Sequence, residues 1–209
     1  ENPDVHVIVL SSGGDRTFCA GASFDELITI TNSEDGKKFF LGFAHVINAM
    51  RKCPKIIICR VHGKAIGGGV GIAAAADYCM ATNYGTIKLS ELALGIGPFV
   101  IGPAVERKIG LSAFSQLALN ATEWQTAIWA KEKGLYHEVF DSIEQLDAYV
   151  DELSQRLAAT SSSALLALKQ ALWHDTQHWD QLLEERAGIS GRLVITEASQ
   201  KAIRESKIV

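Results

Sequence analysis

The segment that most constrains the fold is a strand pattern that leads through three consecutive glycines into a helix pattern. Residues 55–61 are almost continuously apolar, Gly67, Gly68 and Gly69 follow, and residues 70–76 are small. A strand this apolar is normally covered on both faces, as in layered α/β proteins. Glycines ahead of a helix leave free backbone N–H groups at its N-terminus, where an anion or developing oxyanion is favoured. We therefore expect an α/β fold in which these glycines either hold one oxygen atom or serve only close contact between helix and sheet.

The glycine segment matches neither of the common phosphate-binding fingerprints. A Walker motif requires Lys and then Ser or Thr after its last glycine, whereas Val70 follows Gly69 here. The pattern Gly-x-Gly-x-x-Gly is absent from the segment, and no acidic ribose partner stands at the usual distance. A backbone cradle for a single oxygen atom is thus favoured over a nucleotide site.

Two further segments contain residues suited to chemistry. Residues 19–23 are small, so the backbone there can approach a ligand closely or simply form a tight turn. Glu91 stands in the apolar, glycine-containing stretch of residues 88–98. Burial would raise the pKa of this carboxyl group and suit it to proton transfer, whereas a solvated glutamate on a loop is the alternative. Spacing alone leaves both alternatives open.

The composition changes near residue 140. Beyond Phe140 the pattern is almost wholly helical, so we expect an α/β core over residues 1–140 and a helical region over residues 141–209. The leucines of the second region must be buried against the core or against a neighbouring subunit. They are Leu153, Leu157, Leu165, Leu166, Leu168, Leu172, Leu182 and Leu183.

Charge and composition argue against several classes of partner. The 209 residues have a net charge of −4 and no basic run, which predicts neither nucleic acid nor an anionic membrane as a partner. The longest apolar stretches fall far short of the ~20 residues that span a bilayer. The cysteines stand singly, so we expect no metal site and reduced thiols in the cytoplasm, or in the mitochondrial matrix of a eukaryote. The first residues lack a secretory signal, and the missing initial Met indicates that a natural N-terminus is absent.

Histidines and tryptophans are weaker candidates for a site. His174 and His178 stand four residues apart in a helix pattern but lack a third ligand, so we expect a surface pair rather than a metal site. Because no basic groove accompanies them, the tryptophans are expected to pack in the core rather than stack on bases. They are Trp124, Trp129, Trp173 and Trp179.

Three segments together resemble the crotonase, or enoyl-CoA hydratase/isomerase, superfamily. Residues 18–23 are similar to its Phe-x-Ala-Gly-Ala-Asp segment, residues 61–69 to its Val-x-Gly-x-Ala-x-Gly-Gly-Gly segment, and residues 90–92 to its Pro-Glu-x segment. The resemblance runs essentially from end to end. It implies a crotonase-type spiral of ββα units with a C-terminal helical region for oligomerisation as a homotrimer or hexamer. About 40 to 50 residues of N-terminal strands are expected to be missing, from the usual size of such a domain.

The resemblance also implies a substrate and a set of site residues. The substrate would be an acyl-CoA thioester, with no separate cofactor because coenzyme A is part of the substrate. The N–H groups of Ala22 and Gly68 would form an oxyanion hole for the thioester oxygen, which gains charge as an enolate develops. Ala20, Ala22, Gly67 and Gly68 would contact the coenzyme A thioester, with Ala20 and Ala22 beside the adenine. Glu91 matches an acidic residue that exchanges a proton with the substrate or positions water.

Several residues depart from the family pattern. Gly71 stands where the best-known hydratases have a second Glu, and Ser23, Asp25 and Ala202 replace residues that often contact coenzyme A. We expect hydration of a 2-enoyl-CoA by one Glu, similar to the methylglutaconyl-CoA hydratase branch, slightly ahead of Δ3,Δ2-enoyl-CoA isomerisation. A crotonase-like module that binds acyl-CoA without turnover is the third hypothesis.

Overall fold

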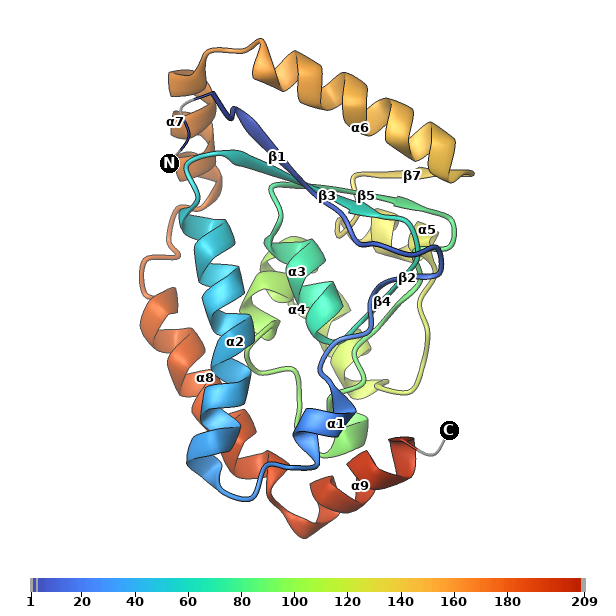
Figure 1. Ribbon diagram of the computed structural model, residues 1–209, viewed down its shortest axis with the longest axis vertical. Coiled ribbons are helices and arrows are strands. Elements are labelled where there is room, and N and C mark those ends of the chain that lie inside the picture. The colour runs from blue at the N-terminus through green and yellow to red at the C-terminus, as the bar shows by residue number, and fades with distance from the viewer. Residues whose placement is uncertain (1, 3, 208–209) are drawn as a thin grey trace.

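Two parallel β-sheets lie at the centre of the computed structural model, which describes residue 2 and residues 4–207 (Figure 1). The first sheet has the order β1-β3-β5-β7, formed by Val7–Leu10, Ile56–Val61, Tyr78–Thr82 and Glu138–Phe140. The second has the order β2-β4-β6, formed by Thr17–Cys19, Lys64–Ile66 and Ile87–Lys88. All neighbouring strands within these sheets are parallel.

Helices complete a repeated unit along the chain. Three times in succession, a strand of the first sheet is followed by a strand of the second sheet and then by helical structure. This repetition confirms the α/β spiral of ββα units expected from the sequence. Residues 24–132 contribute α1 (Phe24–Leu27), α2 (Ser33–Lys52), α3 (Gly68–Ala75), the 3-10 helix η1 (Leu92–Leu94), α4 (Gly102–Leu119) and α5 (Ala127–Glu132). The rest contributes α6 (Ile143–Ala158), α7 (Ser162–Leu172), α8 (Trp179–Val194) and α9 (Glu197–Lys207).

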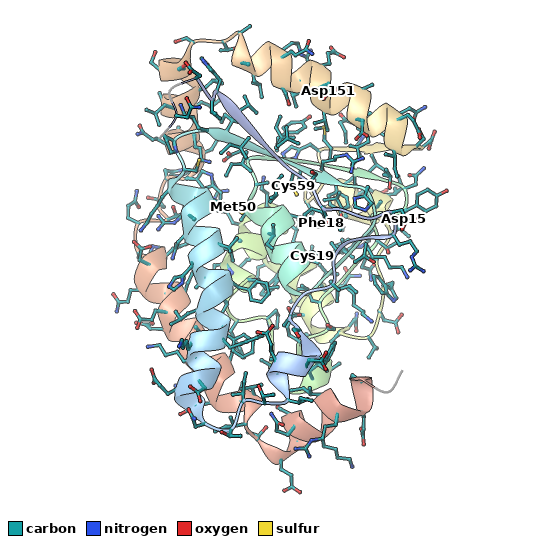
Figure 2. All side chains as sticks on the ribbon, viewed as in Figure 1. Asp15, Phe18, Cys19, Met50, Cys59 and Asp151 are labelled. Atoms are coloured by element: carbon teal, nitrogen blue, oxygen red, sulfur yellow. The ribbon has the colours of Figure 1, made fainter. Side chains whose placement is uncertain are left out.

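Strand β3 is buried on both faces, as its continuous apolar sequence predicts. Successive side chains of a strand point to opposite faces. Ile56 and Ile58 accordingly pack with α6, which lies across one face of the first sheet, whereas Ile57 and Cys59 join the main core on the other face. Figure 2 labels Cys59 together with Phe18 and Met50 of the same core.

Helices α2 and α8 run side by side and touch through their backbones (Figure 1). A Cβ atom built at Gly36 of α2 would lie 2.7 Å from the carbonyl oxygen of Gly191 in α8. Only glycine at both positions permits this approach, because any larger side chain would push the helices apart. The late helix α8 is thereby fixed against the early helix α2.

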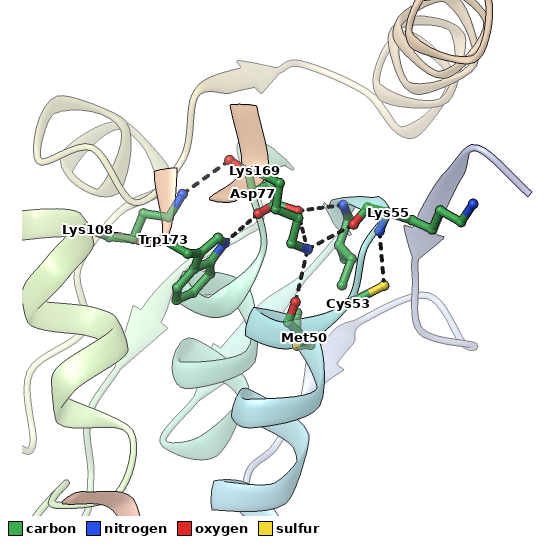
Figure 3. A network of polar contacts seen from close by, with 8 residues as sticks. Met50, Cys53, Lys55, Asp77, Lys108, Lys169 and Trp173 are labelled. Carbon is green, nitrogen blue, oxygen red and sulfur yellow. Dashed lines mark hydrogen bonds and ion pairs between the residues drawn. The ribbon is translucent and has the colours of Figure 1, made fainter. Parts of the chain in front are cut away.

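A buried ion pair fixes α7 to the first sheet and to the end of α2 (Figure 3). The side chains of Asp77 and Lys169 are each 3% exposed, and Lys169 Nζ donates to Asp77 Oδ2 at 2.8 Å. Lys169 also donates to the carbonyl oxygens of Met50 and Lys55, at 2.9 and 2.8 Å. The indole Nε1 of Trp173 donates to Asp77 Oδ1 at 2.7 Å. Because both charges are paired and hydrogen-bonded, they can remain buried.

Two expectations for the second half were wrong. His174 and His178 lie in the turn between α7 and α8 rather than in one helix, because α7 ends at Leu172 and Asp175 within the turn has a positive φ of 59° that a helix does not allow. The tryptophans do not all pack in the core: Trp173 and Trp179 are buried against each other, whereas Trp124 is 39% exposed. Within the described residues no group of three His, Cys, Asp or Glu side chains could hold a metal ion, and no helix is long and apolar enough to cross a bilayer.

Candidate functional site

One cavity of about 430 Å³ collects the site residues expected from the sequence. Ala20, Ala22, Gly67, Gly68 and Glu91 all line it. The volume falls in the range of small-molecule sites, and most of the wall is apolar. The apolar lining includes Phe24, Leu27, Phe40, Phe43, Ile96, Phe99, Val100 and Ile101.

The glycine turn after β4 leaves one amide free at the start of α3. Gly67 has a positive φ of 53°, and its N–H donates to the carbonyl oxygen of Lys88 at 2.8 Å. Gly68 is the first residue of α3, so no helical carbonyl group is available to its N–H. Within the described part of the chain, the N–H groups of Gly68 and Ala22 have no hydrogen-bond acceptor. Both proposed donors of the oxyanion hole are therefore available to a ligand.

The segment that contains Ala22 packs directly against this turn. Gly21 has a positive φ of 84°, and a Cβ atom built there would lie 2.9 Å from the carbonyl oxygen of Ile66 and 3.6 Å from the amide nitrogen of Gly68. A larger residue at position 21 would therefore push the two turns apart. The two free amides line the cavity from neighbouring turns of the second sheet.

Glu91 follows β6 and places its carboxyl group inside the cavity wall. Its backbone carbonyl oxygen accepts hydrogen bonds from Leu94 N and Ile96 N, at 3.1 and 3.0 Å, which fixes the turn. Oε2 is buried and has no hydrogen-bond partner among the described residues. Burial raises the pKa of Glu91 to about 7, against a smaller opposing effect of a hydrogen bond from its own backbone. The carboxyl group is thus buried rather than solvated, and it can gain or lose a proton near neutral pH.

The space in front of Gly71 is filled by an apolar side chain. A Cβ atom built at Gly71 would lie 2.5 Å from Cγ2 of Ile101, the residue at the N-cap of α4, which is 4% exposed. No side chain at position 71 can extend into the cavity while Ile101 keeps this place. Among the described residues, Glu91 is the only carboxylate that lines the cavity.

Several lining residues were not found from the sequence. Lys88, Ser90, Thr122 and Ser190 contribute polar groups. The alternation of β6 could have indicated Lys88, because Ile87 and Leu89 on either side are buried and Lys88 therefore points to the other face. Thr122 and Ser190 come from distant segments, and the sequence around them does not indicate that they line the cavity.

Comparison with known proteins identifies the family. Residues 1–208 match the family model described as "Enoyl-CoA hydratase/isomerase". The chain belongs to this family. The crotonase resemblance predicted from the sequence is thus confirmed.

Both an isomerase and a hydratase are similar in sequence to this chain. It is 30% identical over 187 residues to a peroxisomal Delta(3,5)-Delta(2,4)-dienoyl-CoA isomerase of Arabidopsis thaliana, covering 82% of this chain and 66% of that protein. It is 32% identical over 162 residues to enoyl-CoA hydratase ACTT6 of Alternaria alternata, covering 77% and 52%. The chain therefore spans less than two thirds of the length of either relative.

Solved structures of the enoyl-CoA hydratase/isomerase family have the same fold. A crystal structure of enoyl-CoA hydratase from Bacillus halodurans gives a TM-score of 0.86 at 21% identity, covering 98% of this chain and 83% of that one. Another, from Mycobacterium avium, gives 0.84 at 25% identity, covering 99% and 78%.

Proposed function

We propose that this protein binds an enoyl-CoA thioester and moves its carbon–carbon double bond between the Δ3 and Δ2 positions, with Glu91 as the only acid and base. The observation that carries this proposal is the position of Ile101 in front of Gly71. A reaction that uses one carboxyl group suits this cavity better than a reaction that uses two. Hydration, ranked slightly ahead from the sequence, therefore becomes the second candidate.

The proposed reaction needs one group that first accepts and then donates a proton. The Glu91 carboxylate removes a proton from C2 of a 3-enoyl thioester, and the electron pair moves through the thioester to form a dienolate. The N–H groups of Ala22 and Gly68 stabilise the negative thioester oxygen, and one such donor typically contributes about 3 to 4 kcal/mol. The protonated Glu91 then gives the proton to C4, which leaves the double bond between C2 and C3. Proton and charge balance without water or a second residue.

The environment of Glu91 supports this double role. A pKa near 7 populates both the charged and the protonated form at neutral pH, which favours transfer in either direction. The apolar side chains around it strengthen electrostatic effects at the developing oxyanion.

Hydration remains the second candidate because hydroxyl groups share the cavity with Glu91. Ser90 and Thr122 line the same space and are able to hydrogen-bond a water molecule that Glu91 would activate. In that case Glu91 would also have to supply the proton that C2 receives. The hydratase names of several relatives support this candidate as well.

The deciding experiment compares substrates in deuterated water. Purified protein is given 3-hexenoyl-CoA, crotonyl-CoA and 3-methylglutaconyl-CoA, and the products are separated by liquid chromatography against reference esters before mass spectrometry, because 3-hexenoyl-CoA and 2-hexenoyl-CoA have the same mass. Isomerisation gives 2-hexenoyl-CoA with no added oxygen, whereas hydration gives the 3-hydroxyacyl-CoA. Glu91→Gln should reduce the active reaction about 100-fold or more, as for loss of a general acid–base group. The exposed Glu123→Gln is the matched control.

Two results would contradict the proposal. Full activity of Glu91→Gln would remove the role of this carboxyl group. Tight binding of acyl-CoA without turnover of any of the three substrates would support the binding module instead.

Assembly, domain organisation and compartment stay predictions. We propose a homotrimer or hexamer in which residues 141–209 take part in subunit contacts, and exposed Leu168 and Leu172 of α7 support such a contact. Light scattering of the purified protein would measure the mass, and a monomer at micromolar concentration would contradict the assembly.

A further inference from the structure

The ammonium groups of two lysines lie over the ring of an exposed tryptophan beside the cavity. Trp124 lies between α4 and α5, and the residue is 39% exposed. The Nζ atoms of Lys64 and Lys88 lie 5.2 and 4.7 Å from the centroid of its ring. These two lysines come from the neighbouring strands β4 and β6. All three side chains thus meet at one place on the second sheet.

The two ammonium groups have no negative partner. Among the described residues, neither Lys64 nor Lys88 forms an ion pair or a side-chain hydrogen bond. Since each lies within 5.2 Å of the same centroid, they are at most about 10 Å apart. Two like charges this close repel each other, and salt weakens the repulsion because the Debye length at physiological ionic strength is about 8 Å. An anion beside the ring would relieve this repulsion and accept hydrogen bonds from both lysines.

This place adjoins the candidate active site. Lys88 and Thr122 line the same cavity as Glu91, and Trp124 is two residues from Thr122. The carbonyl oxygen of Lys88 accepts the hydrogen bond from Gly67 N, the residue before the free amide of Gly68. A ligand whose carbonyl oxygen reached Gly68 would therefore have another part near Lys88.

We infer that Lys64, Lys88 and Trp124 form an anion-binding site that holds a phosphate or carboxylate group of the ligand in this cavity. The identity of that ligand rests on the proposed function. Two parts of an acyl-CoA carry such a group: the phosphates of its nucleotide half and, for a dicarboxylic acyl group, the carboxylate at its far end. Lysine suits either, because its ammonium acts as a compact point charge with three donors.

The test is calorimetric binding of three saturated probes, none of which can be isomerised or hydrated. Butyryl-CoA carries phosphates only, glutaryl-CoA carries phosphates and a carboxylate, and butyryl-pantetheine carries neither. The variants are Lys88→Met and Lys64→Met/Lys88→Met, since Met keeps an apolar stem over the indole without the charge. Lys133→Met, an exposed lysine at the end of α5, is the matched control.

The double variant should bind the probe that carries the recognised anion about 10-fold more weakly, as for a partly solvated charge-assisted hydrogen bond. Equal weakening for butyryl-CoA and glutaryl-CoA, with butyryl-pantetheine unchanged, assigns the site to the nucleotide phosphates. Greater weakening for glutaryl-CoA assigns it to the acyl carboxylate. The difference between variant and wild type should shrink at high salt.

The inference is overturned if the double variant binds all three probes like the wild type, or if Lys133→Met weakens binding equally. It is also overturned if the wild type binds neither CoA ester. Failure of the proposed function gives a different result: the wild type would turn over no enoyl-CoA, while the double variant would still bind butyryl-CoA or glutaryl-CoA more weakly.

Discussion

Gly67 lies directly against the carboxyl group of Glu91. A Cβ atom built at Gly67 would be 2.7 Å from Oε1 of Glu91, and the φ of Gly67 is +53°. The residue that precedes the free amide of Gly68 thus also forms the wall behind the acid and base. The proposed oxyanion donor and the proposed proton-transfer group are thus positioned by one turn.

Gly67→Ala should therefore impair both catalysis and folding. The added methyl group strains the backbone and pushes the carboxyl group away, at a cost of about 1 to 3 kcal/mol in stability. We expect kcat/KM on the active substrate to fall at least about 10-fold, because both reacting groups shift together. Steady-state kinetics and thermal unfolding measure the two effects. Gly13→Ala, with nothing within 4 Å of the built Cβ, is the control; an unchanged kcat/KM in Gly67→Ala would contradict the geometry.

Stability should depend on pH through Glu91. The folded protein holds the proton up to pH about 7, whereas the unfolded chain releases it near the ordinary value of 4.5. The free energy of unfolding should thus fall as pH rises from 4.5 to about 7 and then level off, by about 3 kcal/mol for a fully buried group. Glu91→Gln removes this loss, so the variant should be more stable than the wild type at pH 8 and similar to it at pH 4.5. Urea unfolding of both proteins at pH 4.5 and pH 8 measures these stabilities. If Glu91→Gln is no more stable than the wild type at pH 8, the carboxyl group is solvated.

A second carboxyl group introduced at position 71 should be able to act only when the side chain of Ile101 is made smaller. Gly71→Glu alone should destabilise the protein, because the new side chain meets Ile101. Gly71→Glu/Ile101→Ala should recover part of the lost stability and raise hydration of crotonyl-CoA relative to isomerisation of 3-hexenoyl-CoA. Ile101→Ala alone is the control, and product ratios are read by liquid chromatography against reference esters. The same ratio in the double variant and in Ile101→Ala would argue against Ile101 as the group that limits the chemistry.

The buried pair of α7 should be essential for stability. Lys169→Met leaves the Asp77 carboxylate buried without its cation, and loss of one partner typically costs about 3 to 5 kcal/mol. Chemical unfolding should show this loss. Lys201→Met removes an exposed lysine whose ion pair with Glu205 is 3.9 Å long, and it should cost less than about 0.5 kcal/mol. Similar losses in both variants would contradict a special role for the buried pair.

Local patterns predicted the layers and the turns of the site. The continuous apolar run of β3 indicated burial on both faces, and the triple glycine indicated a free helix N-terminus, since both depend on neighbouring residues. The space beside Gly71 is filled by Ile101, which lies thirty positions later in the sequence. No rule based on local spacing could predict this contact. The break at Asp175 was missed because aspartate rarely adopts a positive φ. Trp124 was misjudged because composition shows no basic groove, whereas two strands bring two lysines to it.

The glycine contact between α2 and α8 links the shape of the cavity to the packing of two helices that are far apart in the sequence. Ser190, beside Gly191, lines the cavity, so its position is set by the spacing of two helix axes. Exchanging either glycine for alanine would change the shape of the cavity without altering the glycine turn or Glu91. The choice of ligand can therefore change through α8 while the residues of the proposed active site stay the same.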